Sequence, residues 1–189
     1  MKSVLISIQP KWVEKIASGE KTIEVRKTKP KIETPFKCHI YETKAYDTIF
    51  GKGKPKKLCV GGGRVIGEFV CDKIDEYFYD QAFDESMGCF INKYGYEITS
   101  YELSQTCLSY KEFENYGNTN ALYGWHISNL VIYDKPKELS EFGQKCDMAY
   151  EIRCRDCLIR KGWNECCEVM CKPLTRPPQS WCYVESLGE

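Results

Sequence analysis

Three charged residues near the amino end stand close enough together to bind one ligand. Lys21, Glu24 and Arg26 fall within the stretch KTIEVR. A lysine attracts phosphate as a point charge and an arginine can hold it through a bidentate fork, while a glutamate can orient the arginine or accept a proton. The group therefore favours an anionic ligand. The plainer alternative is that Glu24 and Arg26 form a surface ion pair, which would contribute about 0–1 kcal/mol to stability.

Cysteines form the second candidate group. Of twelve in the chain, seven fall between residues 146 and 182. Thiolates at these short spacings can close a tetrahedral zinc site with no open position for water, so the role of the metal would be structural. Disulfides and unpaired thiols are the alternatives, and a reducing compartment disfavours the first. We assign four ligands, with Cys166 or Cys146 as substitutes: Cys154, Cys157, Cys167 and Cys171.

An aromatic residue and a histidine later in the chain add two possible ligand contacts. Trp125 offers a ring on which a base could stack, and neutral His126 could donate or accept a hydrogen bond near pH 7. Successive residues of a strand face opposite sides, so at most one of the two can point into a given cleft. A core position is the plainer interpretation for Trp125, which makes His126 the better site candidate. His39 is expected to be structural.

The charged group needs a helix and a strand to position it. Residues 4–8 are apolar and predict a buried strand. Pro10 suits the first turn of a helix, which is expected to run to about Ala17 with Gly19 as its stop. A second strand is expected over residues 21–27.

Side-chain alternation along this second strand predicts which way the charges point. Ile23 and Val25 are expected in the core, so Glu24 and Arg26 should project from the opposite face. Lys21 lies at the start of the strand, where its direction is not yet fixed.

The remaining pattern mixes strands and helices without regular alternation. The Gly- and Lys-rich residues 44–64 predict a loop or hairpin, Ser109 and Glu112 predict a capping box, and a short helix is expected to begin at Pro136. Five scattered cysteines are expected to be small buried hydrophobic residues: Cys38, Cys59, Cys71, Cys89 and Cys107. Further strands are expected at residues 37–43, 64–77, 121–134 and 179–186. About six strands with inserted helices predict an α+β fold or a small β-barrel.

Charge is unevenly distributed although the chain of 189 residues has no net charge. Residues 1–57 hold 14 Lys and Arg against 6 Asp and Glu, a net charge of +8, and the other 132 residues hold 13 against 21. An anionic partner for the first third is one interpretation, and mixing of the charges on folding is the other. The first apolar run is too short for a signal peptide, and no window is apolar enough to span a membrane. We therefore expect a cytoplasmic protein with no membrane contact.

The spacing of Gly19, Lys21, Glu24 and Arg26 resembles the G-x-K-x-x-E-x-R signature of the ASCH domain family, whose members are related to PUA-like β-barrels. The preceding SIQPKWVEKIA and the later GRVIGEFVC and YGWHISNLVIYDKPKEL resemble the same family. The closing RPPQSWCYV is similar to a subgroup common in phages and Firmicutes. The resemblance implies an ASCH-like barrel over residues 1–142 and a closing strand within 173–189, with a Cys-rich insertion at 143–172.

The resemblance also implies a cleft that binds RNA, a nucleotide or a modified nucleoside. Besides the charged group, the candidate ligand contacts are Gly19, Trp125, His126, Ser7 and Gln9. Some relatives are amidohydrolases that act on acylated cytidine, and others are linked to RNA cleavage. If this chain were an enzyme, Lys21 and Glu24 would be catalytic, although Glu24 stands where that hydrolase subgroup has a threonine. Capture of a small nucleotide signal, as in phage anti-defence proteins, is a third possibility.

Overall fold

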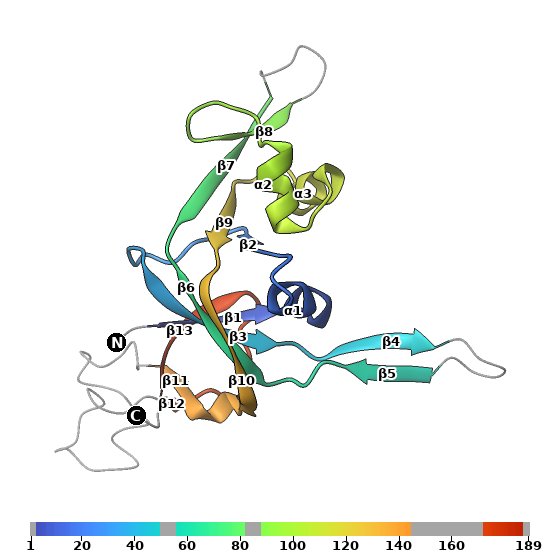
Figure 1. The fold of residues 1–189 in the computed structure, drawn as a ribbon, viewed down its shortest axis with the longest axis vertical. Coiled ribbons are helices and arrows are strands. Elements are labelled where there is room, and N and C mark those ends of the chain that lie inside the picture. The colour runs from blue at the N-terminus through green and yellow to red at the C-terminus, as the bar shows by residue number, and fades with distance from the viewer. Residues whose placement is uncertain (1–2, 50–55, 82–87, 145–171, 187–189) are drawn as a thin grey trace, which may run out of the picture.

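The computed structural model describes residues 3–49, 56–81, 88–144 and 172–186. These residues form two main sheets, a separate two-stranded ribbon and three α-helices. Figure 1 shows the two sheets one above the other along the long axis, with the ribbon extending away to one side.

The larger sheet contains seven described strands: β1 (Ser3–Ile8), β3 (Phe36–Glu42), β6 (Val65–Cys71), β10 (Ser128–Lys137), β11 (Phe142–Gln144), β12 (Lys172–Pro173) and β13 (Trp181–Ser186). Their order is β10-β6-β3-β1-β13-β11-β12. The pair β1 and β3 is parallel, with Leu5 opposite His39, and the other neighbours are antiparallel. Buried and partly exposed residues alternate along the whole of β6.

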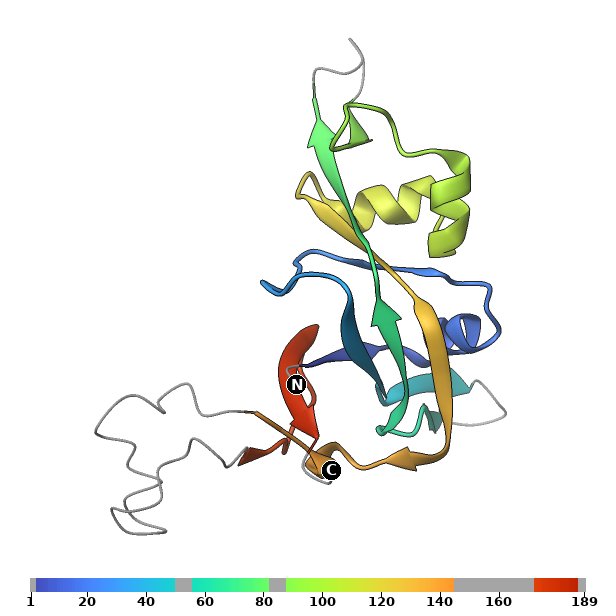
Figure 2. The same ribbon diagram turned by 60° about the vertical axis from the view of Figure 1, so that its left-hand side comes forward.

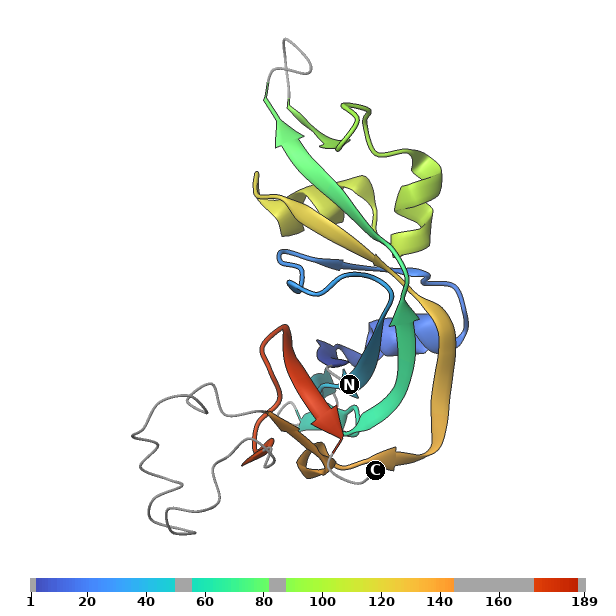
Figure 3. The same ribbon diagram turned by 90° about the vertical axis from the view of Figure 1, so that its left-hand side faces the viewer.

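The smaller sheet has the order β2-β9-β7-β8 and is antiparallel throughout. Its strands are β2 (Ile23–Arg26), β7 (Ile74–Asp80), β8 (Cys89–Asn92) and β9 (Leu122–His126). β7 follows directly from β6, and β10 follows directly from β9. Figures 2 and 3 show these two long segments passing from one sheet into the other. β2 lies at the edge of the smaller sheet, so one side of this short charged strand is left open to neighbouring elements.

Three helices complete the described fold: α1 (Pro10–Ala17), α2 (Ser100–Thr106) and α3 (Tyr110–Gly117). The helix predicted from Pro10 to Ala17 is confirmed, and Gly19 follows it with a positive φ of 79° that suits a residue without a β-carbon. The predicted capping box of Ser109 and Glu112 begins α3. A second box begins α2, in which Thr99 and Glu102 exchange hydrogen bonds.

Apolar side chains form three buried clusters that hold the sheets and helices together. One lies between the larger sheet and α1 and includes Ile6, Ile16, Phe69 and Trp125. A second packs the smaller sheet against α2 and α3 through residues such as Tyr77 and Phe113, whose rings meet edge to face at 5.4 Å. The third includes Leu5, Tyr41 and Phe142 on the other face of the larger sheet. Val25 of β2 belongs to the second cluster, which fixes the position of this edge strand of the smaller sheet.

The α+β class is confirmed, but the hydrogen-bonded strands of the described residues do not close into the predicted barrel. Among the described residues both strand orders are open, ending at β10 and β12 in one sheet and at β2 and β8 in the other. The strand number is also higher than the expected six, because the segments predicted as single strands at 64–77 and 121–134 each cross from one sheet to the other and divide in two.

The prediction that a helix begins at Pro136 is wrong. β10 continues to Lys137, and only a 3-10 turn, Leu139–Glu141, follows. β10 is an edge strand, where a proline without an N–H group removes no required ladder bond. The Gly- and Lys-rich stretch forms a hairpin, as predicted, made of β4 (Ala45–Ile49) and β5 (Lys56–Val60).

The scattered cysteines follow the prediction only in part. Cys38, Cys71 and Cys89 are buried, whereas Cys59 is exposed and Cys107 is partly exposed. The predicted zinc ligands lie outside the described residues, as do residues 145–171 of the Cys-rich insertion predicted at 143–172. The two ends of this insertion pair directly, with Gln144 opposite Lys172. Within the described parts of the chain, no helix has the length and apolar character needed to cross a membrane.

Candidate functional site

A cleft of about 710 Å³ contains all three residues of the predicted charged group. Lys21, Glu24 and Arg26 are buried in its wall, with 3%, 6% and 8% of their surfaces exposed. The walls come from the end of β1, the start of α1, Thr43, one side of α3 with the preceding Leu108, and residues 177–179 before β13. Segments from both ends of the sequence and from its middle therefore meet at one site.

Lys21 is held between the carboxyl-terminal ends of two helices. Its backbone N–H donates to the carbonyl of Lys15 in α1 at 2.9 Å, and its Nζ donates to the carbonyl of Thr106, the last residue of α2, at 2.6 Å. The last carbonyls of a helix have no partner within it and carry a partial negative charge, so an ammonium group is stabilised there. The helix ends thus direct Lys21 toward the cleft.

Glu24 lies between the two cations of the cleft. Its Oε2 is 3.4 Å from Lys21 Nζ, and its Oε1 is 2.9 Å from Arg26 Nη2. Arg26 Nη2 also donates to the carbonyl of Ser7 at 2.6 Å, which joins β2 to β1. Because Glu24 and Arg26 are two residues apart on one strand, both project from the same face, as predicted.

Burial sets this cluster apart from the exposed ion pair that was the plainer alternative. The side chains of Lys21, Glu24 and Arg26 are 3%, 8% and 10% exposed, whereas those of the surface pair Lys15 and Glu20 are 41% and 61% exposed. Removing charges from water costs several kcal/mol for each ion unless close partners compensate. Each charge here has such a partner, and the formal net charge of the cluster is +1.

Arg26 retains donor capacity beyond its described contacts. A guanidinium carries five N–H donors, and Nη2 makes the two described bonds. Arg26 Nε is buried and has no hydrogen-bond partner among the described residues. A ligand with a hydrogen-bond acceptor could satisfy the donors of Arg26 that these contacts leave unused.

The junction between β1 and α1 also lines the cleft, where Ser7 and Gln9 were predicted as ligand contacts. Ser7 Oγ donates to the carbonyl of Pro178 at 2.6 Å, and Ser7 N–H donates to the carbonyl of Ser180 at 2.9 Å. Gln9 is exposed and immediately precedes α1. Ser7 therefore fixes the wall formed by residues 177–179, and the Gln9 side chain is accessible from solvent.

Two aromatic residues at the cleft were not predicted as site residues. Trp12 in α1 is partly exposed, with Lys11 Nζ at 4.4 Å and Lys21 Nζ at 5.2 Å from its ring centroid. Tyr116 in α3 is 37% exposed, and burial of its hydroxyl raises its pKa, which Arg26 opposes. Trp12 was assigned only to the helix pattern and Tyr116 to none, because no local signal in the sequence places α1 and α3 on one cleft.

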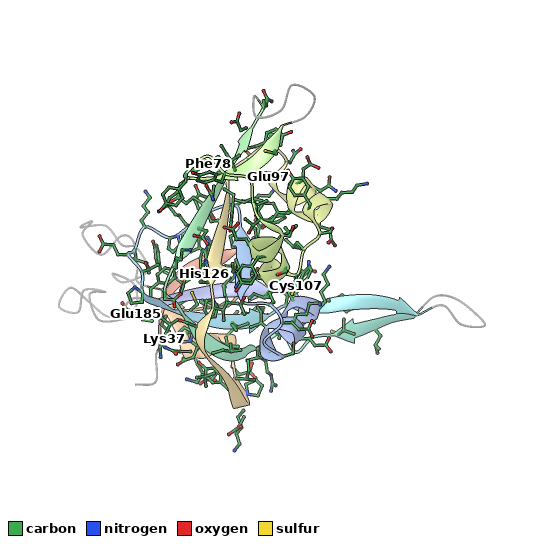
Figure 4. The ribbon with its side chains drawn as sticks, turned by 45° about the horizontal axis from the view of Figure 1, so that its top comes forward. Lys37, Phe78, Glu97, Cys107, His126 and Glu185 are labelled. Atoms are coloured by element: carbon green, nitrogen blue, oxygen red, sulfur yellow. The ribbon has the colours of Figure 1, made fainter. Side chains whose placement is uncertain are left out.

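Three other predicted residues do not line the cleft. Trp125 is fully buried, with its ring 5.8 Å from that of Phe36, so its faces are covered by core residues. His126 Nε2 lies 2.6 Å from Asp75 Oδ2 instead. The His126 backbone lies opposite Ile23 of β2, but its side chain, labelled in Figure 4, pairs with Asp75 of β7 and does not line the cleft. Gly19 shapes the turn before β2 without contributing to the walls.

The two histidines have separate surroundings outside the cleft. Burial would raise the pKa of Asp75, but hydrogen bonds from His126 and Lys73 outweigh it and hold this pKa below its usual range. His39 was predicted to be structural and is buried in the larger sheet, with Nδ1 3.3 Å from the Tyr133 hydroxyl. Burial lowers the pKa of His39 to about 4, although the Glu68 carboxylate opposes the shift.

Among the described residues, no cluster of three or more His, Cys, Asp or Glu side chains has the arrangement of a metal site. The predicted ligands Cys154, Cys157, Cys167 and Cys171 lie in residues 145–171, outside that part of the chain. The zinc site therefore stays a prediction from the sequence.

Comparison with known proteins identifies one family and one set of related structures. The ASCH domain model matches residues 6–153. The crystal structure of an ASCH protein from Zymomonas mobilis is similar over 97% of this chain and 87% of its own, with 19% identity and a TM-score of 0.49. A single-residue mutant of that protein covers 97% and 88% with 17% identity and a TM-score of 0.50, a likeness of fold alone. No curated protein matches the chain.

Proposed function

The chain belongs to the ASCH domain family, and on that basis we propose that it binds RNA, or a nucleotide or modified nucleoside, in the cleft that contains Lys21, Glu24 and Arg26. One observation carries the proposal: a buried cluster of two cations and one acid lines a cleft. Its net charge of +1 complements a single phosphodiester. The Arg26 guanidinium supplies directional donors for phosphate oxygens, and Lys21 supplies a point charge.

Aromatic and apolar residues of the same cleft support a ligand that also carries a ring. Trp12 and Tyr116 line it, together with Pro177 and Pro178. Stacking of a base on an aromatic side chain contributes about 1–3 kcal/mol. Glu24 adds a carboxylate that can accept a hydrogen bond from a base amino group if its ion pairs rearrange. Anionic and aromatic recognition in one cleft fits a nucleotide better than a simple anion.

The binding test compares Arg26→Lys with the matched variant Arg64→Lys. Arg64 forms an exposed ion pair with Glu138, at 3.1 Å, and does not line the cleft. Titration calorimetry with nucleoside monophosphates and anisotropy with a labelled single-stranded RNA should show weaker binding for Arg26→Lys and unchanged binding for Arg64→Lys. Thermal melts of both variants check that they are folded. Equal affinities of wild type and Arg26→Lys for every nucleotide and RNA tested would remove the cleft from the proposal.

The same titrations separate the related roles that the family suggests. Saturation by a small nucleotide at one site per chain, with little dependence on salt, would favour capture of a nucleotide signal. RNA binding should weaken steeply with salt, because each phosphate contact releases counterions. Incubation with an acylated cytidine or with RNA, followed by chromatography, tests turnover. Turnover that is lost in Lys21→Met and Glu24→Gln, while thermal melts show both variants still folded, would make these two residues catalytic.

We also propose a structural zinc ion for the Cys-rich insertion, held by Cys154, Cys157, Cys167 and Cys171. The spacing of these thiols supports it, and the pairing of Gln144 with Lys172 brings the two ends of the insertion together. Elemental analysis of protein purified without chelators should find about one zinc per chain. The double variant Cys154→Ser/Cys157→Ser should lose it, while Cys59→Ser, which removes an exposed free thiol, should keep it. A wild type with under half an equivalent of zinc would disprove this assignment.

A further inference from the structure

The β4–β5 ribbon, residues 45–49 and 56–60, is not explained by a cleft that binds one nucleotide. Its strands pair only with each other among the described residues, and Figure 1 shows the ribbon extending away from the body beside α1. Five residues per strand span about 17 Å at roughly 3.4 Å per residue. An isolated two-stranded ribbon is marginally stable in water. A binding partner, or attachment to the body of the protein, would therefore stabilise this one.

The root of the ribbon is attached at the edge of the cleft. Thr43, which lines the cleft, donates its N–H to the carbonyl of Ile8 at 2.9 Å. On the returning strand, Gly62 N–H donates to Glu42 Oε2 at 2.5 Å. Gly61 has φ +90°, and a β-carbon there would lie 2.3 Å from the Thr43 carbonyl and 2.6 Å from Pro10 Cγ. Both legs of the ribbon are thus held against the start of α1, which is a cleft wall.

The residue types of the ribbon suit a polyanion. The described strands and the residue that precedes them contain three lysines, Lys44, Lys56 and Lys57, and one acid, Asp47. Tyr46 is 61% exposed and Leu58 is 51% exposed. Lysines on an exposed edge also discourage pairing with other sheets, but an exposed tyrosine and leucine beside them do not serve that purpose. Positive charge combined with an exposed aromatic ring is typical of surfaces that bind single-stranded nucleic acid.

We propose that the β4–β5 ribbon binds the backbone of a single-stranded RNA whose neighbouring nucleotide occupies the cleft. The inference rests on the proposed function and specifies its ligand as a polymer instead of a free nucleotide. Lysines of the ribbon neutralise phosphates flanking the bound nucleotide, and Tyr46 offers a stacking face for an adjacent base. Because phosphate contacts carry no sequence information, the ribbon adds affinity and leaves selection of the nucleotide to the cleft.

The test removes charge from the ribbon and, as a control, from two lysines elsewhere. Lys56→Ala/Lys57→Ala is compared with Lys93→Ala/Lys135→Ala, whose two lysines are exposed and lie outside the cleft and the ribbon. Anisotropy is measured over a range of salt with a labelled single-stranded RNA of about 12 nucleotides, within the roughly 4–16 that such sites cover. Binding of nucleoside monophosphates is measured by calorimetry, and thermal melts check folding.

Loss of two phosphate contacts should make the slope of log K against log salt shallower by about 1.4, since each contributes roughly 0.7 for single strands. The Kd for RNA should rise in the ribbon variant alone, and the Kd for mononucleotides should not change. Equal RNA slopes in the two double variants, or a wild type that binds mononucleotides but no RNA, would overturn the ribbon proposal and leave the cleft intact. Failure of the proposed function is recognised separately, by an Arg26→Lys variant that binds every ligand normally.

Discussion

Lys21 Nζ lies 2.6 Å from the carbonyl oxygen of Thr106, 85 residues further along the chain. This contact ties the start of the charged strand to the end of α2, and the neighbouring Thr22 N–H donates to the carbonyl of Gln105 at 3.0 Å. A single helix end therefore fixes both the backbone and the side chain at the entrance to β2. The position of the cation in the cleft depends on α2, which itself contributes none of the cleft walls.

Replacement of Lys21 by methionine should destabilise the protein strongly. It leaves Glu24 buried with only Arg26 as its cation, and removal of one partner from a buried ion pair costs about 3–5 kcal/mol. Urea denaturation should show this loss in the free energy of unfolding, against under about 1 kcal/mol for Lys37→Met, which breaks a half-exposed pair. Lys21→Met/Glu24→Gln should lose less than the sum of its single variants. Full additivity would mean that the two charges do not stabilise each other.

The two tryptophans Trp12 and Trp125 should have opposite roles. Trp12→Ala should raise the Kd for the nucleotide or RNA ligand about tenfold, because a stacking face worth roughly 1–3 kcal/mol is lost. Trp125→Phe should lower the midpoint of urea unfolding, since the indole is fully buried, and should leave the ligand Kd unchanged. Calorimetry and denaturation on both variants check this. A Trp125→Phe variant with normal stability and impaired binding would contradict the assignment.

Stability should fall at mildly acidic pH because of His39. Its pKa is about 4 in the folded protein, below the 6.5 of an unperturbed histidine, because burial disfavours the charged ring. Between these values the unfolded chain binds the proton and the folded chain does not, so the free energy of unfolding decreases as pH falls. The shift corresponds to roughly 3 kcal/mol at about 1.36 kcal/mol per pKa unit.

Urea denaturation at pH 7 and pH 4.5, on wild type and His39→Gln, measures this dependence. The variant should show a flatter profile between about pH 6.5 and 4, the range between the two pKa values. His126→Gln provides the matched control for the other histidine, which pairs with Asp75. Identical profiles for wild type and His39→Gln would assign the acid sensitivity to other groups.

Loss of the cap of α3 should disturb the cleft as well as the helix. Ser109→Ala removes the hydroxyl that accepts from the Glu112 N–H, at a cost of about 1 kcal/mol. Leu108 and Tyr116, on either side of this cap, both line the cleft, so ligand affinity should fall with stability. In α2, Ser104→Ala removes a hydroxyl that donates to the Tyr101 carbonyl on an exposed side and should change stability by under about 0.5 kcal/mol. Unfolding and binding titrations on both variants test the link.

Local pattern predicted the parts of the site that lie close together in the chain. Pro10 and Gly19 bound the first helix as expected, since a fixed φ suits a helix start and a positive φ suits its end. Glu24 and Arg26 share a face because strand side chains alternate. The Ser109 box also followed from local hydrogen bonding. Such features depend on a few neighbouring residues and are therefore present in the sequence itself.

Local pattern failed where a segment's partner decided its structure. Pro136 can start a helix, but the pairing of β10 with β6 keeps this proline in a strand. Trp125 is an exposed stacking platform or a core residue depending on what packs over it, and the larger sheet covers it. The strands at 64–77 and 121–134 each divide between two sheets, so the arrangement stays open where a barrel was expected.

The sequence alone determined the family signature, the first helix and the common face of two of the charges. The tertiary structure alone decided that Lys21 joins them, that Trp12, Tyr116 and Pro178 enclose them, and that the ribbon is attached beside them. The physical reason is that local backbone preferences act over a few residues. Burial of a charge, in contrast, depends on side chains that distant segments bring together only when the sheets and helices pack.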